Sequence, residues 1–143
     1  MMNTKRFVVL ALIFALMANF LISCSSNAEE ITVTLIITAD EDEIFNGDIK
    51  LNYENPTVLM LIQEAAILYE FDITLNDRGD SIKSIKQYTD YKDENNIDHF
   101  WEYKINGVLP ENTTGGKANA QPIVDGDVIE YVYSTFDPAS VAK

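Results

Sequence analysis

The sequence has one cysteine, one histidine and one tryptophan among its 143 residues. Because Cys24 is the only cysteine, no disulfide can form within the chain, and His99 alone cannot supply the nitrogen and sulfur ligands of a zinc site. The sequence also lacks a nucleophile elbow, a phosphate-binding glycine loop and any motif that places two carboxylates together. These absences predict a protein that is not an enzyme, since catalysis would need a cleft with perturbed carboxylates that no motif indicates.

Basic residues are scarce as well, with ten Lys and Arg against twenty-three Asp and Glu and a net charge of −13. A chain this acidic is repelled by phosphate backbones and by anionic lipid. Nucleic acid is therefore excluded as an electrostatically driven partner. Solubility of the protein is the simplest reason for the charge.

The longest apolar run lies at the N-terminus, from Phe7 to Ile22, directly after Lys5 and Arg6. A basic start followed by a hydrophobic run is the layout of a secretory signal peptide. The run is at the short end of the length that spans a bilayer, which disfavours the alternative of a retained membrane helix. It ends at Cys24, and the segment 21–24 resembles the bacterial lipobox.

That resemblance implies that residues 1–23 are a lipoprotein signal peptide and that Cys24 carries the lipid. Two or more acyl chains would hold the protein stably at the outer face of the cell membrane, so an extracytoplasmic, lipid-anchored location is expected. Loss of Lys5 and Arg6 leaves eight basic against twenty-three acidic residues, a charge of −15. Residues 24–30 form the lipidated cysteine and a tether of about 20 Å, short enough to favour exchange with a membrane partner.

Strand and helix patterns follow in the rest of the chain. Residues 31–39 alternate apolar residues with threonines, and a second alternating run after the acidic segment 40–43 predicts a first hairpin. Thr57 is a suitable N-cap for a helix over 58–69, whose circumference is so apolar that the helix should be mostly buried. Later elements are expected to be strands over 71–75, 82–85, 100–105 and 128–133, a turn over 76–80, and loops over 90–98 and 108–121.

The strand over 128–133 is apolar on both sides, which indicates a central position in a sheet. Packing one helix across a mixed sheet would bury the apolar face of the helix and that of the sheet together. The sequence therefore predicts an α+β, β-grasp-like domain over residues 31–136, with a tail over 137–143.

Three motifs carry a resemblance to a known family. Thr57-Val58-Leu59 opens the helix, residues 101–107 (WEYKING) form an aromatic strand and turn, and residues 125–131 (DGDVIEY) lead into the last strand. In order and spacing these motifs resemble the C-terminal β-domain of transcobalamin and intrinsic factor, which also recurs alone in bacterial surface proteins. The resemblance implies a β-grasp domain that binds a soluble ligand, with cobalamin or another corrinoid as the candidate.

Candidate ligand-binding residues come from two regions. Trp101 and Tyr103 could stack on a flat ligand, although core packing is the alternative for both, and the same choice holds for Tyr131. The loop over 108–121 offers neutral donors and acceptors that would match the amide rim of a corrinoid, or it is a plain connection. Its candidate residues are Asn112, Thr113, Thr114, Gly115 and Gly116.

The acidic segment 40–43 has oxygen ligands that suit calcium, but Ile44 and Phe45 break the calcium-loop pattern. A solvated hairpin tip explains it better, and no metal or cofactor is expected.

Two functions remain open at this stage. The first is a lipoprotein that captures a small polar ligand, such as cobalamin, and delivers it to a vitamin-uptake transporter in the membrane. The second is a surface module that binds another protein or the cell wall through a sheet edge, without a small molecule. The second predicts buried aromatic residues and an exposed edge strand.

Overall fold

The computed structural model describes residues 28–111 and 117–140. Cys24, the signal segment and the predicted ligand-binding residues 112–116 lie outside this range. Within it, no helix has the length and apolar content needed to cross a membrane.

The first two strands form a long hairpin, as predicted. β1 (Ile31–Ala39) pairs antiparallel with β2 (Asp42–Leu51), and the register shifts between Ile37 and Thr38. The chain reverses at Asp40, whose φ of 52° is the left-handed conformation that a tight turn requires. The acidic segment is thus split between the turn and the start of β2, which begins four residues earlier than the alternation from Asn46 indicated.

The single described α-helix, α2 (Val58–Leu68), begins at the predicted N-cap. The Thr57 hydroxyl accepts a hydrogen bond from the backbone N–H of Met60 at 3.3 Å. Its apolar face is buried, but the prediction of a mostly buried helix is wrong for its last turn. Ile67, Leu68 and Tyr69 are 74%, 56% and 53% exposed.

A small antiparallel sheet follows, built from three short strands in chain order. β3 (Ile73–Leu75) and β4 (Ile82–Ile85) match the predicted strands, and β5 (Tyr88–Thr89) extends the sheet. The expected surface loop over 90–98 is wrong in part, since β6 (Tyr91–Lys92) pairs with the start of the next strand. β5 and β6 each contain one aromatic residue, Tyr88 and Tyr91. Because their sequence neighbours are polar, the sequence showed no strand pattern here.

The last two long strands complete the main sheet. β7 (Asp98–Ile105) pairs antiparallel with β8 (Val128–Phe136), and β8 also pairs in parallel with β1. A short 3-10 turn, η2 (Pro138–Ser140), follows. The five-stranded order β2-β1-β8-β7-β6 confirms the central position predicted for β8.

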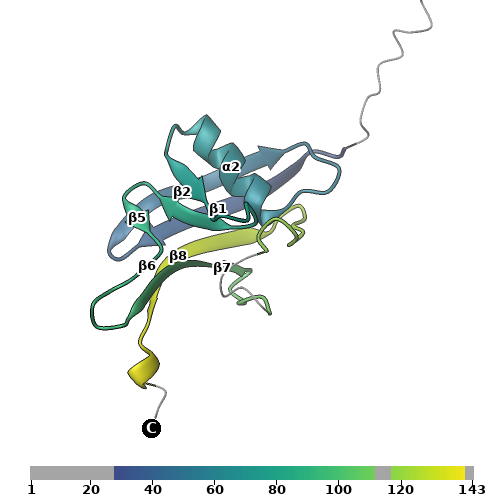
Figure 1. Ribbon diagram of the computed structural model, residues 1–143. Coiled ribbons are helices and arrows are strands. Elements are labelled where there is room, and N and C mark those ends of the chain that lie inside the picture. Colours follow the sequence, from purple (N-terminus) through teal and green to yellow (C-terminus); the bar gives the residue numbers. More distant parts are fainter. Residues whose placement is uncertain (1–27, 112–116, 141–143) are drawn as a thin grey trace, which may run out of the picture.

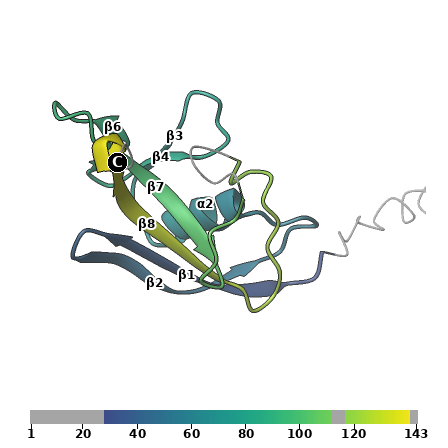
Figure 2. The same ribbon diagram turned by 90° about the horizontal axis from the view of Figure 1, so that it is seen from below.

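The core lies between the five-stranded sheet and a layer made of α2 and the small sheet (Figures 1 and 2). Alternate residues of β1 point into it, and Val33, Leu35 and Ile37 are completely buried. The opposite face of β1 carries Thr32, Thr34 and Thr38, which are half-buried. This mixed sheet with one packed helix confirms the predicted α+β, β-grasp-like architecture.

The two ends of the main sheet have different neighbours. We call the end where β1 begins, at Ile31, the entry end, and the end at Ala39 the far end; eight strand steps separate them by about 26 Å. At the entry end, Asn106 and Gly107 form the predicted tight turn with φ of 52° and 77°. The Asp125 carboxylate accepts the Thr32 N–H at 2.7 Å there.

Candidate functional site

A row of aromatic rings runs across the inner face of β7 and β8 toward the far end. His99, Trp101 and Tyr103 alternate along β7 and therefore share one face, on which Tyr131 and Tyr133 of β8 stand opposite Tyr103 and Trp101. Neighbouring ring centroids lie 4.3 to 6.5 Å apart. The aromatic row consists of Tyr103, Tyr131, Trp101, Tyr133, Tyr88, His99 and Tyr91.

The half of the row nearest the entry end is buried. Trp101 and Tyr103 are each 6% exposed and Tyr131 is 2% exposed. The indole Nε1 of Trp101 donates to the Tyr88 carbonyl at 3.0 Å, so its polar edge is satisfied inside the protein. The structure therefore places these three predicted site residues in the core, which was the alternative left open for them.

The other half of the row is open. Tyr91 is 52% exposed, and its ring stacks on His99 at 4.3 Å with an interplanar angle of 9°. Tyr88 and Tyr133 lean against each other at 5.4 Å and 57°. Their hydroxyls are held, because Tyr88 donates to the Asp42 carboxylate and Tyr133 to the Thr89 carbonyl, both at 2.6 Å.

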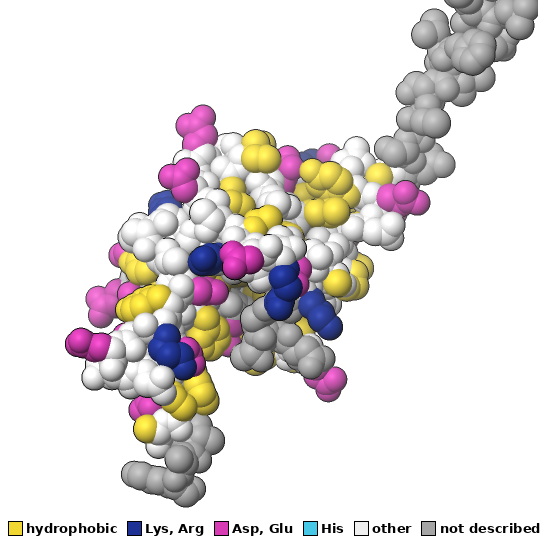
Figure 3. Space-filling model, in the orientation of Figure 1, with side chains coloured by type: hydrophobic (Ala, Val, Ile, Leu, Met, Phe, Trp, Pro, Cys, Tyr) yellow, Lys and Arg dark blue, Asp and Glu magenta, His cyan; other side chains and the backbone are white. Residues whose placement is uncertain are grey.

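A recess of about 350 Å³ lies at this open half of the row. Four of its rings, Tyr88, Tyr91, His99 and Tyr133, line the recess together with Asp40, Gln87 and Thr89. We call it the far-end recess. In the space-filling view, hydrophobic and acidic side chains meet on the flank where β5 and β6 lie (Figure 3). Its volume is at the lower limit of small-molecule sites, which suits a small ligand or one protruding group.

The surroundings of the recess are electrostatically negative. Burial, followed by the charges of Tyr91, Asp90 and Asp40, raises the pKa of Tyr133 to about 12. Burial also raises the pKa of Asp90, although its carboxylate accepts the Trp101 N–H at 2.9 Å. The Tyr131 pKa rises for the same primary reason, burial. The raised pKa values mean that Tyr133, Asp90 and Tyr131 all lose their protons less readily than they would in water.

A second candidate surface lies at the entry end, around the predicted loop. Val108, Leu109 and Val124 are 67%, 47% and 63% exposed. The amide of Asn106 donates to Asp127 at 2.9 Å and fixes this side of the loop. These three exposed apolar residues near the Asn106 turn form a surface that we call the entry-end surface.

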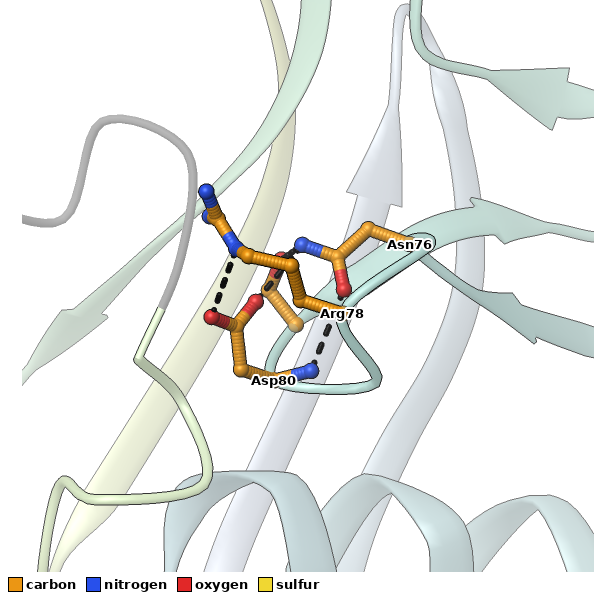
Figure 4. Close-up of polar contacts among 4 residues, drawn as sticks. Asn76, Arg78 and Asp80 are labelled. Carbon is orange, nitrogen blue, oxygen red and sulfur yellow. Dashed lines mark hydrogen bonds and ion pairs between the residues drawn. The ribbon is translucent and has the colours of Figure 1, made fainter.

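The turn between β3 and β4 supports the chain beyond the loop (Figure 4). The Asp80 carboxylate accepts from Asn76 Nδ2 at 2.6 Å and from Arg78 Nε at 2.9 Å. The hydrogen bond from Asn76 is the main cause of its lowered pKa. The Asp80 carbonyl accepts the Asn119 N–H at 3.2 Å, so the turn braces the segment that follows residue 116.

Metal binding has no support among residues 28–111 and 117–140, where no group of three or more His, Cys, Asp or Glu side chains is placed to hold an ion. In the acidic segment 40–43, two of the carboxylates accept hydrogen bonds from other side chains. Asp42 accepts from Tyr88, and the Glu43 carboxylate accepts from Asn46 at 3.1 Å.

Sequence reasoning weighed Tyr133 as a ligand platform but missed the three other rings of the far-end recess, Tyr88, Tyr91 and His99. His99 lies two residues before Trp101 in the same alternating strand, so the sequence pattern could have predicted that both side chains share one face. Tyr88 and Tyr91 flank Thr89 and Asp90 in a segment with no clear period. Their convergence on His99 depends on tertiary pairing of β6 with β7, which local pattern does not encode.

The architecture and the recess define an α+β, β-grasp-like domain with a small aromatic site open at one end of its sheet. No family model matches the chain, and no curated protein matches it either. Among solved structures, it is similar to haptocorrin in complex with Cbi, with a TM-score of 0.60 and 14% identity over 81% of this chain. The chain spans 28% of the haptocorrin chain.

A protein from Ruminococcus gnavus, described provisionally as metal binding, is also similar, with a TM-score of 0.45 and 19% identity. That alignment covers 76% of this chain and 99% of the other. At these identities the likeness to haptocorrin concerns the fold. It is consistent with a transcobalamin-like fold.

Proposed function

We propose that this protein is a lipid-anchored, extracytoplasmic binding protein that captures a small polar ligand, with cobalamin or a related corrinoid as the candidate, and delivers it to a membrane importer. The observation that carries the proposal is the fold shared with haptocorrin, whose structure holds Cbi, over 81% of the chain. The lipobox-like segment ending at Cys24 supports the anchor, and the six residues before Ile31 keep the domain near the membrane.

The entry-end surface is the better place for a corrinoid. The far-end recess is too small to enclose a macrocycle, and Trp101, Tyr103 and Tyr131 present no open ring face. Val108, Leu109 and Val124 instead offer exposed apolar contact near the Asn106 turn, whose amide is hydrogen-bonded to Asp127 and Val128. Such a surface covers one side of a flat ligand. Most of the haptocorrin chain has no counterpart in this sequence, so modest affinity is expected unless a partner covers the other side.

A calorimetric titration of residues 25–143, which contain every described element, tests the proposal. Cobinamide and cobalamin should each bind one to one with a Kd of about 1 µM or weaker, near −8 kcal/mol at that value. Leu109→Asp and Val124→Asp should weaken binding by about tenfold through lost apolar contact.

Ile67→Asp is the matched control, because Ile67 is also apolar and exposed, at 74%, but lies on α2. It should leave the Kd unchanged. Absence of heat together with absence of retention in equilibrium dialysis would refute corrinoid capture by the domain alone.

A protein-interaction module is the second candidate, and two observations favour it. Its expectation of buried aromatic residues agrees with the burial of Trp101, Tyr103 and Tyr131. β2 also forms one edge of the main sheet, along which a partner strand could add. A photo-crosslinker at Lys50 of β2 should then give a discrete adduct in native membranes, and one at Ile67 of α2 should not.

A further inference from the structure

Four of the seven residues that line the far-end recess are aromatic. The hydroxyls of Tyr88 and Tyr133 donate hydrogen bonds to the Asp42 carboxylate and to the Thr89 carbonyl, respectively, both at 2.6 Å. Trp101 lies behind both rings, with centroids 6.5 Å from Tyr88 and 5.1 Å from Tyr133, and its Nε1 holds the Tyr88 backbone. The two rings are therefore fixed before any ligand arrives, which lowers the entropic cost of binding.

The outer wall of the recess is the stacked pair of Tyr91 and His99. The rings are nearly parallel, with an interplanar angle of 9° and centroids 4.3 Å apart. His99 also lies 6.2 Å from Tyr133, so the stack continues the wall formed by the inner rings. Tyr91 is half exposed, so part of its side chain can be reached from solvent.

Negative charge surrounds these rings on several elements. Asp40 lines the recess from the β1–β2 turn, and Asp42 holds Tyr88 from the start of β2. Asp93 places a carboxylate oxygen 3.8 Å from His99 Nε2. No Lys or Arg is among the lining residues, and the nearby Lys92 is paired with Asp98 at 3.2 Å.

We propose that the far-end recess binds an organic cation, specifically an alkylammonium group. Aromatic π-faces carry negative potential and attract such cations, and several rings beside a carboxylate form the usual cage for them. A volume of about 350 Å³ accommodates one such group. This site is separate from the entry-end surface and does not depend on corrinoid binding.

Other ligand classes fit the recess poorly. An anion would meet Asp40 with no Lys or Arg among the lining residues to oppose it. A metal ion would find only one carboxylate in the lining, and no three-residue metal cluster is present in the described chain. A neutral apolar ligand would gain from the rings but nothing from the carboxylates.

Choline and its uncharged isostere 3,3-dimethyl-1-butanol form the test pair, titrated against residues 25–143 at constant pH. The single histidine provides the probe, since its ring Cε1–H gives one NMR resonance at the wall of the recess. Choline should shift it saturably, and the isostere should bind at least about tenfold more weakly. Equal binding of both compounds, or no shift with choline up to about 100 mM, would overturn the proposal.

Variants assign the binding to the recess. Tyr91→Ala and Asp40→Asn should each weaken choline binding by at least about threefold. Tyr53→Ala removes another exposed tyrosine, 42% accessible, and Asp77→Asn another exposed carboxylate, so neither should change the titration. Equal weakening by the control variants would contradict a site at the recess.

A second arm identifies the source of the cation. Phosphatidylcholine vesicles carry the same head group, so binding to vesicles that is lost in Tyr91→Ala would indicate a lipid. Binding to free choline alone would indicate a soluble compound. A cobinamide titration of Tyr91→Ala keeps the two proposals apart, because this variant should retain the corrinoid affinity of the unmodified chain.

Discussion

At the scale of single residues, the aromatic row divides at Trp101. On one side the rings are core, and on the other they are surface that a ligand can reach. Trp101 belongs to both, since its indole is buried while it supports Tyr88 and Tyr133 from behind. Trp101 thus contributes to the stability of the domain and, by supporting Tyr88 and Tyr133, to the proposed ligand binding at the far-end recess.

Trp101→Ala should destabilise the domain by about 3 to 5 kcal/mol, because it removes a buried ring and leaves a cavity. The loss of the Nε1 hydrogen bond to the Tyr88 carbonyl adds to this cost. Urea denaturation measures the change in unfolding free energy. Tyr91→Ala is the control and should cost less than about 1 kcal/mol, because its ring is half exposed. Equal stabilities for the two variants would argue against core packing of Trp101.

Alkaline pH should destabilise the domain through Tyr133. Its pKa is raised to about 12 in the folded state by burial and by neighbouring negative charge, whereas the unfolded chain has the ordinary value near 10. As pH rises from 10 to 12 the unfolded chain loses this proton first, so stability is unaffected below pH 10 and falls above it. Denaturation midpoints across this range should fall less steeply in Tyr133→Phe than in the unmodified protein.

At the scale of elements, periodicity predicted most of the fold. β1, α2 and β8 carry strong apolar patterns and matched their predicted positions closely. β5 and β6 were missed because two-residue strands carry no period of their own and exist through pairing with β4 and β7. The burial of Trp101 and Tyr103 was similarly undecidable from the strand pattern, since either face of an alternating strand can be covered.

Substitutions at the N-cap residue Thr57 test how much the capping hydrogen bond stabilises α2. Thr57→Ala removes the acceptor for the Met60 N–H and should cost about 1 kcal/mol of unfolding free energy. Thr57→Ser retains a hydroxyl and should recover most of that loss. If both variants unfold at the same denaturant concentration, the capping bond contributes nothing and packing of the helix face alone determines its stability.

At the scale of the whole molecule, location and binding depend on different parts of the chain. The proposed anchor is Cys24, while the entry-end surface and the far-end recess lie at opposite ends of one sheet. The far-end recess is about 26 Å from the first residue of β1 along the strand direction. A ligand at the recess would therefore face away from the start of the domain, and one at the entry-end surface would lie beside it.

Cys24→Ser tests the anchor directly. The unmodified protein should fractionate with membranes and incorporate labelled palmitate, because acylation makes its attachment effectively stable. The variant should lose the label. If Cys24→Ser still incorporates palmitate, the lipobox interpretation is wrong, and fractionation of an unlabelled chain with membranes would point to a retained N-terminal helix.

The parallel pairing of β1 with β8 also constrains the order of folding. Thr34 lies opposite Val128, so the centre of the sheet joins the first described strand to the last. Until residue 136 is available, β1 has only β2 as a partner, and a lone hairpin is marginal in water. Closing so long a loop makes assembly slow relative to helix formation. A nascent chain of this topology completes its main sheet only once its C-terminal strand is available, which under the proposed export means after that strand has crossed the membrane.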